Sequence, residues 1–285
     1  MVSETNLKTP VIEFRNVSLA FDQKPALSNV SFELRRGQMI LVTGASESGK
    51  SVLLRLAAGL QRPDDGQILI EGREIQNIDE DALLEIRARS MGVVFQDQSL
   101  FTALSVFDNA AYRLDERGCS EETIESAVLD TLSFVGFQDD TQKIPEELSV
   151  GMRRRLEFAR AMVGWPPIML LDEPTAGLDP INARMILDLI IRARNEHRIS
   201  SLYVTKEMHE IPYLAARSGG VAEAGNETKL LLLERGKIAF LGSVPEFQSS
   251  NLPAVTRMTR PEPGAPLTTS HVADPWSRKR KKRLL

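Results

Sequence analysis

A mixed α/β fold is predicted by three apolar stretches and by the residues that come after each of them. The run Met39–Val42 leads into the motif Gly44–Ser51 and then into the helix-forming stretch Val52–Ala58. The run Ile168–Leu171 ends in two carboxylates, and the run Ser201–Thr205 follows a predicted helix. Strands that alternate with helices pair in parallel through right-handed crossovers. The sequence therefore predicts a largely parallel sheet covered by helices.

The motif after the first run has the spacing G-x-x-x-x-G-K-S of a phosphate-binding loop between a strand and a helix. Its glycines let the backbone curl so that N–H groups point at phosphate oxygens, and the helix N-terminus adds partial positive charge. Lys50 is expected to reach the outer phosphates, and the Ser51 hydroxyl to ligate Mg²⁺. We therefore expect a P-loop NTPase. Its nucleotide-binding residues are Gly44, Ala45, Ser46, Glu47, Ser48, Gly49, Lys50, Ser51 and Val52.

Composition narrows the class of protein. The 285 residues are 42% hydrophobic and 26% charged, which is ordinary for a globular protein. No apolar run reaches the length of a membrane span, the N-terminus lacks a signal-peptide core, and the single cysteine, Cys119, fits a reducing compartment. The net charge of −4 includes six positive charges over 278–283, so the rest of the chain carries −10. An acidic body argues against nucleic-acid binding.

Residues 1–250 are expected to form one domain, with a mostly helical insert over about 73–163. The predicted strands are 11–20, 26–34, 67–71, 92–95, 168–171 and 201–205, with a hairpin over 229–241; the predicted helices include 79–89, 120–135, 149–163 and 181–195. From 251 to 285 proline, serine and charge dominate, so we expect a peripheral or disordered extension.

The two carboxylates after the second apolar run complete the predicted site. Asp172, at the strand end, is expected to hold Mg²⁺ directly or through water. Glu173, the next residue, points to the opposite side from Asp172. It is expected to act as the general base for the attacking nucleophile, or to orient that nucleophile. Two acids after a strand also suit a helix cap. The phosphate loop makes the catalytic interpretation the stronger one.

Four further features resemble motifs of ABC-transporter ATPases, in the order in which that family has them. Leu148–Met152 (LSVGM) opens a basic helix and resembles the signature motif. Gln96 resembles the Q-loop glutamine, and Gly177–Asp179 resembles the D-loop. Phe21 falls where the family places an aromatic residue that stacks on adenine. The resemblance covers about residues 11–250.

The resemblance implies an ABC nucleotide-binding domain with a RecA-like lobe, a helical subdomain and an antiparallel β-subdomain. It also implies ATP and Mg²⁺ as cofactors. It implies a head-to-tail homodimer, in which two ATP molecules lie between the phosphate loop of one protomer and Ser149–Met152 of the other. Ser149 is expected to be the N-cap of its helix and to present its hydroxyl to the partner's γ-phosphate. The implied ATP-site residues are Phe21, Ser149, Val150, Gly151, Met152 and Asp179; the implied magnesium ligands are Ser51, Gln96 and Asp172; the implied catalytic residues are Glu173, Lys206 and Gln96.

A narrower resemblance lies in residues 99–112 (SLFTALSVFDNAAY), which are similar to the ATPase of MCE-type (Mla-like) phospholipid transport systems. It implies a permease dimer in the inner membrane that contacts the helical subdomain around Gln96–Tyr112. It also implies an MCE-domain lipid-binding protein in the same complex, and a peripheral location on the cytoplasmic face of that membrane. The alternative is that Phe101, Phe107 and their neighbours only form core.

Three positions depart from the family pattern. Lys206 stands in place of the switch-loop histidine and is expected to contact the γ-phosphate without switching its charge. Val150 replaces a signature glycine, which would cost about 1–3 kcal/mol if that position needed a positive φ. Glu47 adds a negative charge beside an anion site. We therefore expect a slow or specially regulated ATPase.

Three other functions stay open. The chain could be the ATPase of a small-solute importer, which shares every ATP-site residue, or a catalytically weak regulatory subunit. A soluble ABC protein acting on nucleic acid or the ribosome usually has two ATPase units or a long coiled coil, and neither is expected here. The basic run 278–283 is expected to be solvated, with contact to anionic lipid as the second interpretation. It also resembles the C-terminal extensions that reach the neighbouring protomer in Mla-like ATPases.

Overall fold

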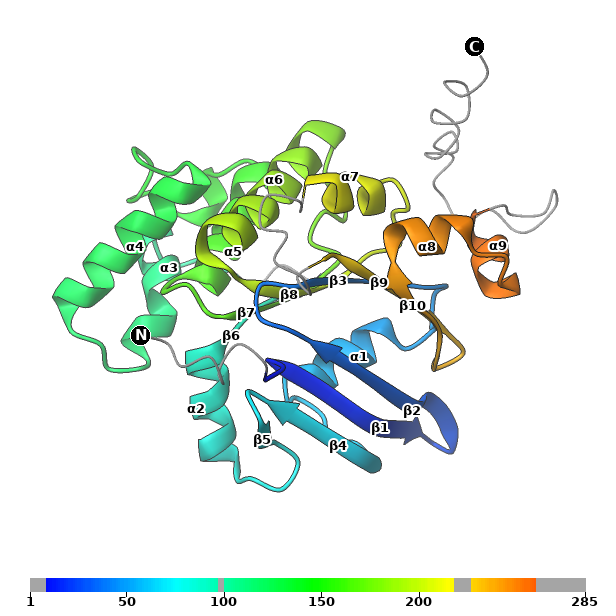
Figure 1. Cartoon of the computed structure of the whole chain (residues 1–285). Coiled ribbons are helices and arrows are strands. Elements are labelled where there is room, and N and C mark those ends of the chain that lie inside the picture. Colours follow the sequence, from blue (N-terminus) through cyan, green and yellow to red (C-terminus); the bar gives the residue numbers. More distant parts are fainter. Residues whose placement is uncertain (1–8, 97–99, 218–226, 260–285) are drawn as a thin grey trace, which may run out of the picture.

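The computed structural model describes residues 9–96, 100–217 and 227–259, which form two sheets and a layer of helices (Figure 1). The strands are β1 (Ile12–Phe21), β2 (Lys24–Leu34), β3 (Met39–Thr43), β4 (Asp65–Ile70), β5 (Arg73–Glu74), β6 (Met91–Val94), β7 (Ile168–Asp172), β8 (Ser200–Val204), β9 (Lys229–Glu234) and β10 (Lys237–Ser243). The helices are α1 (Lys50–Ala57), α2 (Glu80–Ser90), α3 (Val106–Asp115), α4 (Glu121–Val135), α5 (Val150–Met162), α6 (Pro180–His197), α7 (Glu210–Arg217), α8 (Val244–Ser249) and α9 (Pro253–Thr259).

A six-stranded sheet in the order β10-β9-β3-β8-β7-β6 forms the centre, and all its pairs are parallel except that of β10 with β9. Every residue of β3 is buried. Met39 and Leu41 belong to the core shared with α3–α7, whereas Ile40 and Val42 belong to the core on the opposite face. Side chains alternate along a strand, so a strand covered on both faces is apolar throughout. The α/β prediction is confirmed.

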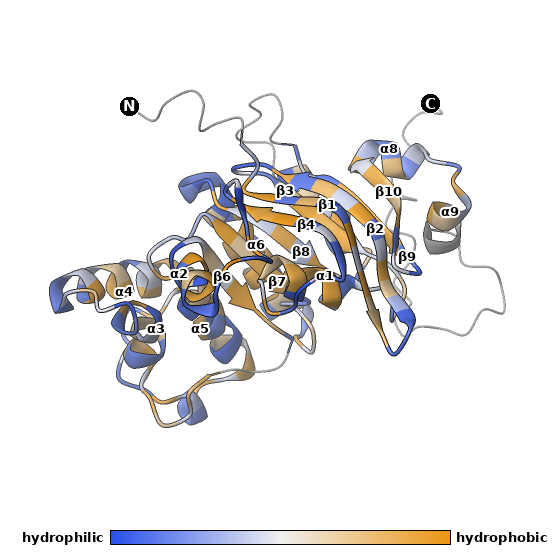
Figure 2. Ribbon diagram, turned by 90° about the horizontal axis from the view of Figure 1, so that it is seen from below, coloured by the Kyte–Doolittle hydropathy of each residue, from blue (hydrophilic) through white to orange (hydrophobic). Residues whose placement is uncertain are grey.

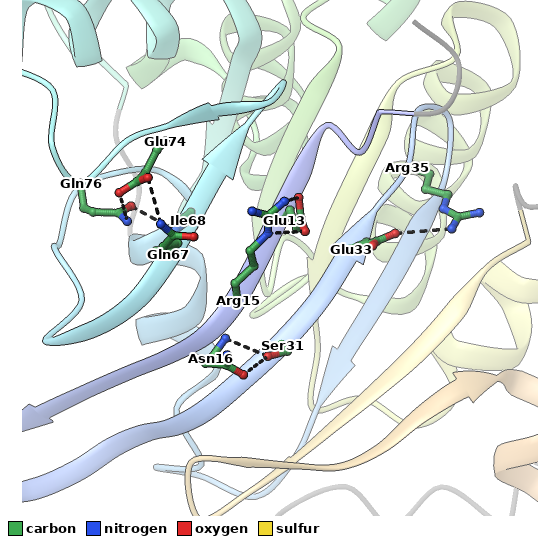
Figure 3. A network of polar contacts seen from close by, with 10 residues as sticks. All are labelled: Glu13, Arg15, Asn16, Ser31, Glu33, Arg35, Gln67, Ile68, Glu74 and Gln76. Atoms are coloured by element: carbon green, nitrogen blue, oxygen red, sulfur yellow. Dashed lines mark hydrogen bonds and ion pairs between the residues drawn. The ribbon is translucent and has the colours of Figure 1, made fainter. Parts of the chain in front are cut away.

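A four-stranded antiparallel sheet, β2-β1-β4-β5, covers the other face, with α1 between the two sheets (Figure 1). Its inner side is apolar: Phe14 pairs with Phe32, and their rings stack with centroids 4.7 Å apart. Its outer side carries polar contacts, including the Glu13–Arg15 ion pair (Figure 3). Figure 2 shows the same division across the molecule, with mostly hydrophobic central strands and hydrophilic turns.

The helical insert contains α2, α3, α4 and α5. Side chains at four N-caps each accept a backbone N–H: Asp79, Ser105, Ser120 and Ser149. Such caps stabilise a helix start, and they explain why the predicted helix boundaries agree with the observed ones to within one or two residues. Within the described residues, no helix is both long and apolar enough to span a membrane.

The C-terminal segment contains a helix that the sequence does not suggest. α9 spans Pro253–Thr259, and Val255 is buried against the core shared with α3–α7. The basic run 278–283 lies outside the described residues, as do residues 218–226 and residues 97–99, which follow Gln96.

Candidate active site

The carboxyl ends of three parallel strands bring the predicted site residues to one edge of the central sheet. β3 runs into the phosphate loop, β7 ends at Asp172, and Lys206 follows β8 by two residues. Val42 lies opposite Val204, which lies opposite Asp172. Ligands of open α/β sheets bind outside the carboxyl ends of the strands. The phosphate loop, the acidic strand end and the switch position therefore form one site.

The loop Gly44–Ser51 is curled around the ammonium group of Lys50. Lys50 Nζ donates to the carbonyl oxygens of Gly44 at 2.9 Å and Ala45 at 2.8 Å. Gly44 and Gly49 have φ values of 152° and 102°. A Cβ on Gly44 would lie 2.3 Å from a carbonyl oxygen of β9, and one on Gly49 would lie 2.6 Å from a carbonyl oxygen of β2. Only glycine fits these two positions, as the phosphate-loop prediction requires.

The remaining loop residues divide between solvent and the interior. Ala45, Ser46 and Glu47 are exposed, and Glu47 has a left-handed φ of 61°. The Glu47 carboxylate is therefore solvated, which limits its repulsion of a bound anion. The Ser48 hydroxyl is buried and has no hydrogen-bond partner among the described residues. A buried polar group without a partner, inside a cradle closed by glycines, fits a loop shaped for a polyanionic ligand.

Ser51 and Asp172 provide the oxygen ligands that a magnesium ion needs. The Ser51 hydroxyl hydrogen-bonds to the Asp172 carboxylate. Burial raises the pKa of Asp172, and the bond from Ser51 opposes that rise. Burial also lowers the pKa of Lys50, against the attraction of Glu173 and Asp172. A hydroxyl, a carboxylate and phosphate oxygens are hard ligands of the kind that Mg²⁺ prefers, so these residues fit a magnesium triphosphate.

Glu173 and Lys206 form an ion pair across this edge. Glu173 has a left-handed φ of 45°, and its N–H donates to the Val204 carbonyl at 3.0 Å. The Lys206 ammonium lies 2.9 Å from Glu173 Oε2, and this bond raises the pKa of Lys206. The nearby His209 has its Nδ1 3.7 Å from the Glu207 carboxylate instead.

The start of α5 and the start of α6 contact each other within one chain. Ser149 is the N-cap of α5, as predicted, and accepts from the Met152 N–H at 3.2 Å. A Cβ on Gly151 would lie 2.0 Å from Asn182 Oδ1. Asn182 in turn donates to Asp179, the N-cap of α6, at 2.5 Å, and these bonds lower the pKa of Asp179. The sequence does not reveal this contact, because it joins residues that are distant along the chain.

Val150 carries no strain. It is the first residue of α5, and it is absent from the described residues with positive φ. The strain considered from the sequence therefore does not arise. Its side chain is 48% exposed beside Ser149, and Met152 packs partly against the helical core.

Phe21 and Gln96 lie at the margins of the site. Phe21 ends β1 and is 46% exposed. The next strand, β2, lies against Gly49 of the phosphate loop near its start. Gln96 is exposed two residues after β6. The adenine contact of Phe21 and the catalytic and magnesium contacts of Gln96 stay predictions.

A buried carboxylate beside the site was not predicted. Glu210, at the start of α7, is 1% exposed and accepts hydrogen bonds from three hydroxyl groups. The sequence contains one sign of these bonds. Thr175 lies two residues after the two acids, and Tyr203 and Thr205 lie at the end of the third apolar run, where apolar residues would otherwise be expected.

Comparison with known proteins assigns the family. The profile described as "ABC transporter" matches residues 27–176. The chain is 37% identical to "Protein TRIGALACTOSYLDIACYLGLYCEROL 3, chloroplastic" of Arabidopsis thaliana, over 86% of this chain and 72% of that protein. It is 34% identical to the "Methionine import ATP-binding protein MetN" of Brucella abortus (strain 2308), over 87% of this chain and 68% of that protein.

A solved structure agrees with this assignment. The ATP-binding cassette MJ0796, in a dimeric post-hydrolysis state bound to ADP and Pi, is similar with a TM-score of 0.69 and 25% identity. The match covers 82% of this chain and 98% of that one. Together with the phosphate loop and the acidic end of β7, these matches show that the chain belongs to the ABC transporter family, as an ATP-binding subunit whose cofactors are ATP and Mg²⁺.

Proposed function

We propose that the chain hydrolyses ATP with the Glu173 carboxylate as the group that orients the attacking water and accepts its proton. The observation that carries this proposal is the meeting of the phosphate loop, Asp172 and Glu173 at one sheet edge. Bound MgATP supplies the transferable γ-phosphoryl group and the leaving ADP. Lys50 would balance phosphate charge, and Ser51 and Asp172 would hold the metal ion, with Gln96 as a further ligand.

Lys206 is proposed to make this hydrolysis slow or regulated. Its ammonium lies 2.9 Å from Glu173 Oε2 and so occupies a carboxylate oxygen that would otherwise face the attacking water. The pair has to lengthen before Glu173 can accept a proton from water, and the γ-phosphate is the competing anion for Lys206. A catalytically weak regulatory subunit is the alternative that this pair keeps open.

Phosphate release by three proteins tests the proposal. The wild type is expected to turn over ATP roughly 100-fold or more faster than Glu173→Gln, because a general base contributes a factor of that order. Lys206→Ala is expected to keep ATP affinity and change turnover. A wild-type rate no faster than that of Glu173→Gln would mean that the site binds ATP without hydrolysing it.

The working form is proposed to be a homodimer with ATP between its protomers. Ser149, Val150, Gly151 and Met152 of one copy would complete the site of the other. Support comes from the exposed α5 N-terminus and from the dimeric state of the related cassette. Ile181, on the first turn of α6, is 75% exposed beside the same surface. ATP contacts both copies only when they are closed, so it favours closure, and hydrolysis removes that preference.

For the cargo, import of a small solute is the first candidate. The supporting observation is the methionine-import relative, which aligns over 87% of this chain. The phospholipid function suggested by residues 99–112 is the second candidate. A specific observation favours it too: the 37% identical Arabidopsis protein is named after a glycolipid, trigalactosyldiacylglycerol. The cargo is selected by membrane and binding subunits, so the ATP site itself does not separate these candidates.

The membrane partner is proposed to be a permease dimer on the helical subdomain around Gln96–Tyr112, which would hold the chain at the cytoplasmic face of the membrane. Phe101 and Tyr112 are 38% and 40% exposed there, with ring centroids 4.5 Å apart. Purification of the full chain from its native membranes tests both points. A permease with a solute-binding protein supports the first cargo, whereas a permease with an MCE-domain protein supports the second and contradicts the first.

A further inference from the structure

The Glu210 carboxylate, at the start of α7, holds together two segments at the back of the active site. Thr175 donates to Glu210 Oε1 at 2.5 Å. Tyr203 and Thr205 donate to Glu210 Oε2 at 2.8 Å and 2.6 Å. Both carboxylate oxygens are therefore satisfied by hydroxyl groups, and the described part of the chain gives Glu210 no ion pair.

Burial makes these bonds matter. Glu210 is 1% exposed and Tyr203 is fully buried. A buried carboxylate is tolerated only when hydrogen bonds replace its water shell. Burial, followed by the charge of Glu210, raises the pKa of Tyr203 well above its usual value, so the phenol remains a donor.

The first of these two segments is the loop between β7 and α6. It begins with Glu173, whose φ is left-handed, and ends with Asp179, the N-cap of α6. Thr175 lies between them, and its hydroxyl gives the loop a side-chain bond to another segment. Two local bonds, Ala176 N–H to Glu173 and Leu178 N–H to Thr175, complete the turn.

The second segment is the turn after β8 that carries Lys206. The Thr205 hydroxyl donates to Glu210 and accepts from the Glu207 N–H at 2.9 Å, so it fixes the backbone on both sides of Lys206. Thr205 N–H also donates to the Val42 carbonyl at 3.0 Å. The two loops that present the paired Glu173 and Lys206 side chains are thus attached to one buried carboxylate.

We propose that Glu210 is a positioning residue that sets the distance between Glu173 and Lys206 and couples the Lys206 turn to the loop 173–179. A displacement of Asp179 by a second copy would reach Lys206 through Thr175, Glu210 and Thr205. The inference rests on the proposed roles of Glu173 and Lys206, but its structural half, coupling between the two loops, can be tested without hydrolysis.

Valine and serine substitutions at the two threonines provide matched tests in the full-length chain. Thr175→Val and Thr205→Val remove one hydroxyl with little change of shape, and Thr175→Ser and Thr205→Ser restore it. Thr131→Val is the control, because Thr131 is also buried and, among the described residues, its hydroxyl bonds within α4, to the Ala127 carbonyl at 2.8 Å. Amide hydrogen exchange, ATP affinity and turnover are measured for each variant.

Coupling predicts changes in the segment that was not mutated. Thr175→Val is expected to speed amide exchange in residues 205–209, and Thr205→Val in residues 174–178, with normal exchange in the serine variants and in Thr131→Val. Each valine variant is expected to lose about tenfold in kcat, the value of one hydrogen bond to a charged group, with ATP affinity unchanged. The double valine variant is expected to lose no more kcat than the less active of the two single variants, because either substitution alone uncouples the loops.

Three results would overturn the proposal. Exchange that rises only in the mutated segment would show that the two loops are independent. Losses in kcat that multiply in the double variant would show two separate local effects. Losses of ATP affinity in step with kcat and with melting temperature would show a role in folding alone. An inactive wild type would refute the proposed hydrolysis instead, and the exchange experiment would still decide the coupling.

Discussion

The Lys206 ammonium lies 2.9 Å from the Glu173 carboxylate, so the lysine that follows β8 is paired with the carboxylate that follows β7. The Lys206 side chain is 55% exposed and that of Glu173 15%. Such a half-exposed pair adds little to stability. Its consequence is local: the positive charge of Lys206 stays beside the proposed base, Glu173, at every pH near neutrality.

A histidine at this position should give the enzyme a pH switch. The pair raises the pKa of Lys206, so its contribution is complete below the usual lysine pKa and is lost only as pH rises through the raised value. Lys206 therefore stays charged between about pH 6 and pH 9, whereas an imidazole loses its proton near pH 6.5. We expect Lys206→His to match the wild-type kcat at about pH 5.5 and to exceed it severalfold at about pH 8. A kcat ratio that is constant from acid to alkaline pH would contradict this account.

Lys50 should determine nucleotide affinity. Lys50→Met removes the ammonium and the two bonds that hold the carbonyls of Gly44 and Ala45. ATP affinity is expected to fall by about tenfold or more, since a single hydrogen bond to a charged group is worth that much. Lys143→Met, which removes an exposed lysine of the helical insert, is the control and should bind ATP normally. Calorimetric titration with MgATP measures both; equal affinities would exclude the phosphate-loop assignment.

Gly151 should tolerate a methyl group only when Asn182 is shortened. A Cβ at Gly151 meets Asn182 Oδ1 at 2.0 Å, and moving Asn182 breaks its bond to Asp179. Gly151→Ala is expected to lower turnover by about tenfold, through loss of contacts worth roughly 1–2 kcal/mol.

The double variant separates the possible causes. Adding Asn182→Ala removes the clash, so Gly151→Ala should cost less activity in that background than in the wild type. An unchanged cost would show that Gly151 is needed for another reason.

Arg194 should matter for stability rather than for turnover. It is 5% exposed, its Nε donates to the Gly37 carbonyl at 2.8 Å and its Nη1 to the Thr228 hydroxyl at 2.9 Å. Burial lowers its pKa to about 10, so it remains a cation at neutral pH. Arg194→Leu is expected to cost about 2–4 kcal/mol in the free energy of unfolding, because two buried acceptors lose a charged donor.

An exposed arginine provides the comparison. Arg89→Leu, which breaks a surface pair with Glu85, should stay within about 1 kcal/mol of the wild type. Urea denaturation measures both values. A similar small effect at Arg194 would show that its buried bonds add little.

Local rules explain what the sequence predicts well. The phosphate loop needs glycine at Gly44 and Gly49 for steric reasons that act within a few residues, and Ser149 caps its own helix. Parallel pairing then brings Asp172 and Lys206 to the loop without further information.

Tertiary contacts account for what the sequence does not predict. The Lys206–Glu173 pair, the Gly151–Asn182 contact and the bonds to Glu210 join residues whose distance depends on the packing of whole elements. The helix α9 has the same origin. Its seven residues are too few for a periodic pattern, and the burial of Val255 against the core accompanies it.

The central claim is that two copies of this chain close on MgATP and that hydrolysis at Glu173 reopens them. The most direct measurement is the mass of Glu173→Gln by analytical ultracentrifugation with and without saturating MgATP. We predict a monomer without nucleotide and a dimer with it, because the variant binds ATP but cannot remove the γ-phosphate that favours closure. A Glu173→Gln protein that stays monomeric in saturating MgATP, both alone and with its membrane partner, would contradict the account.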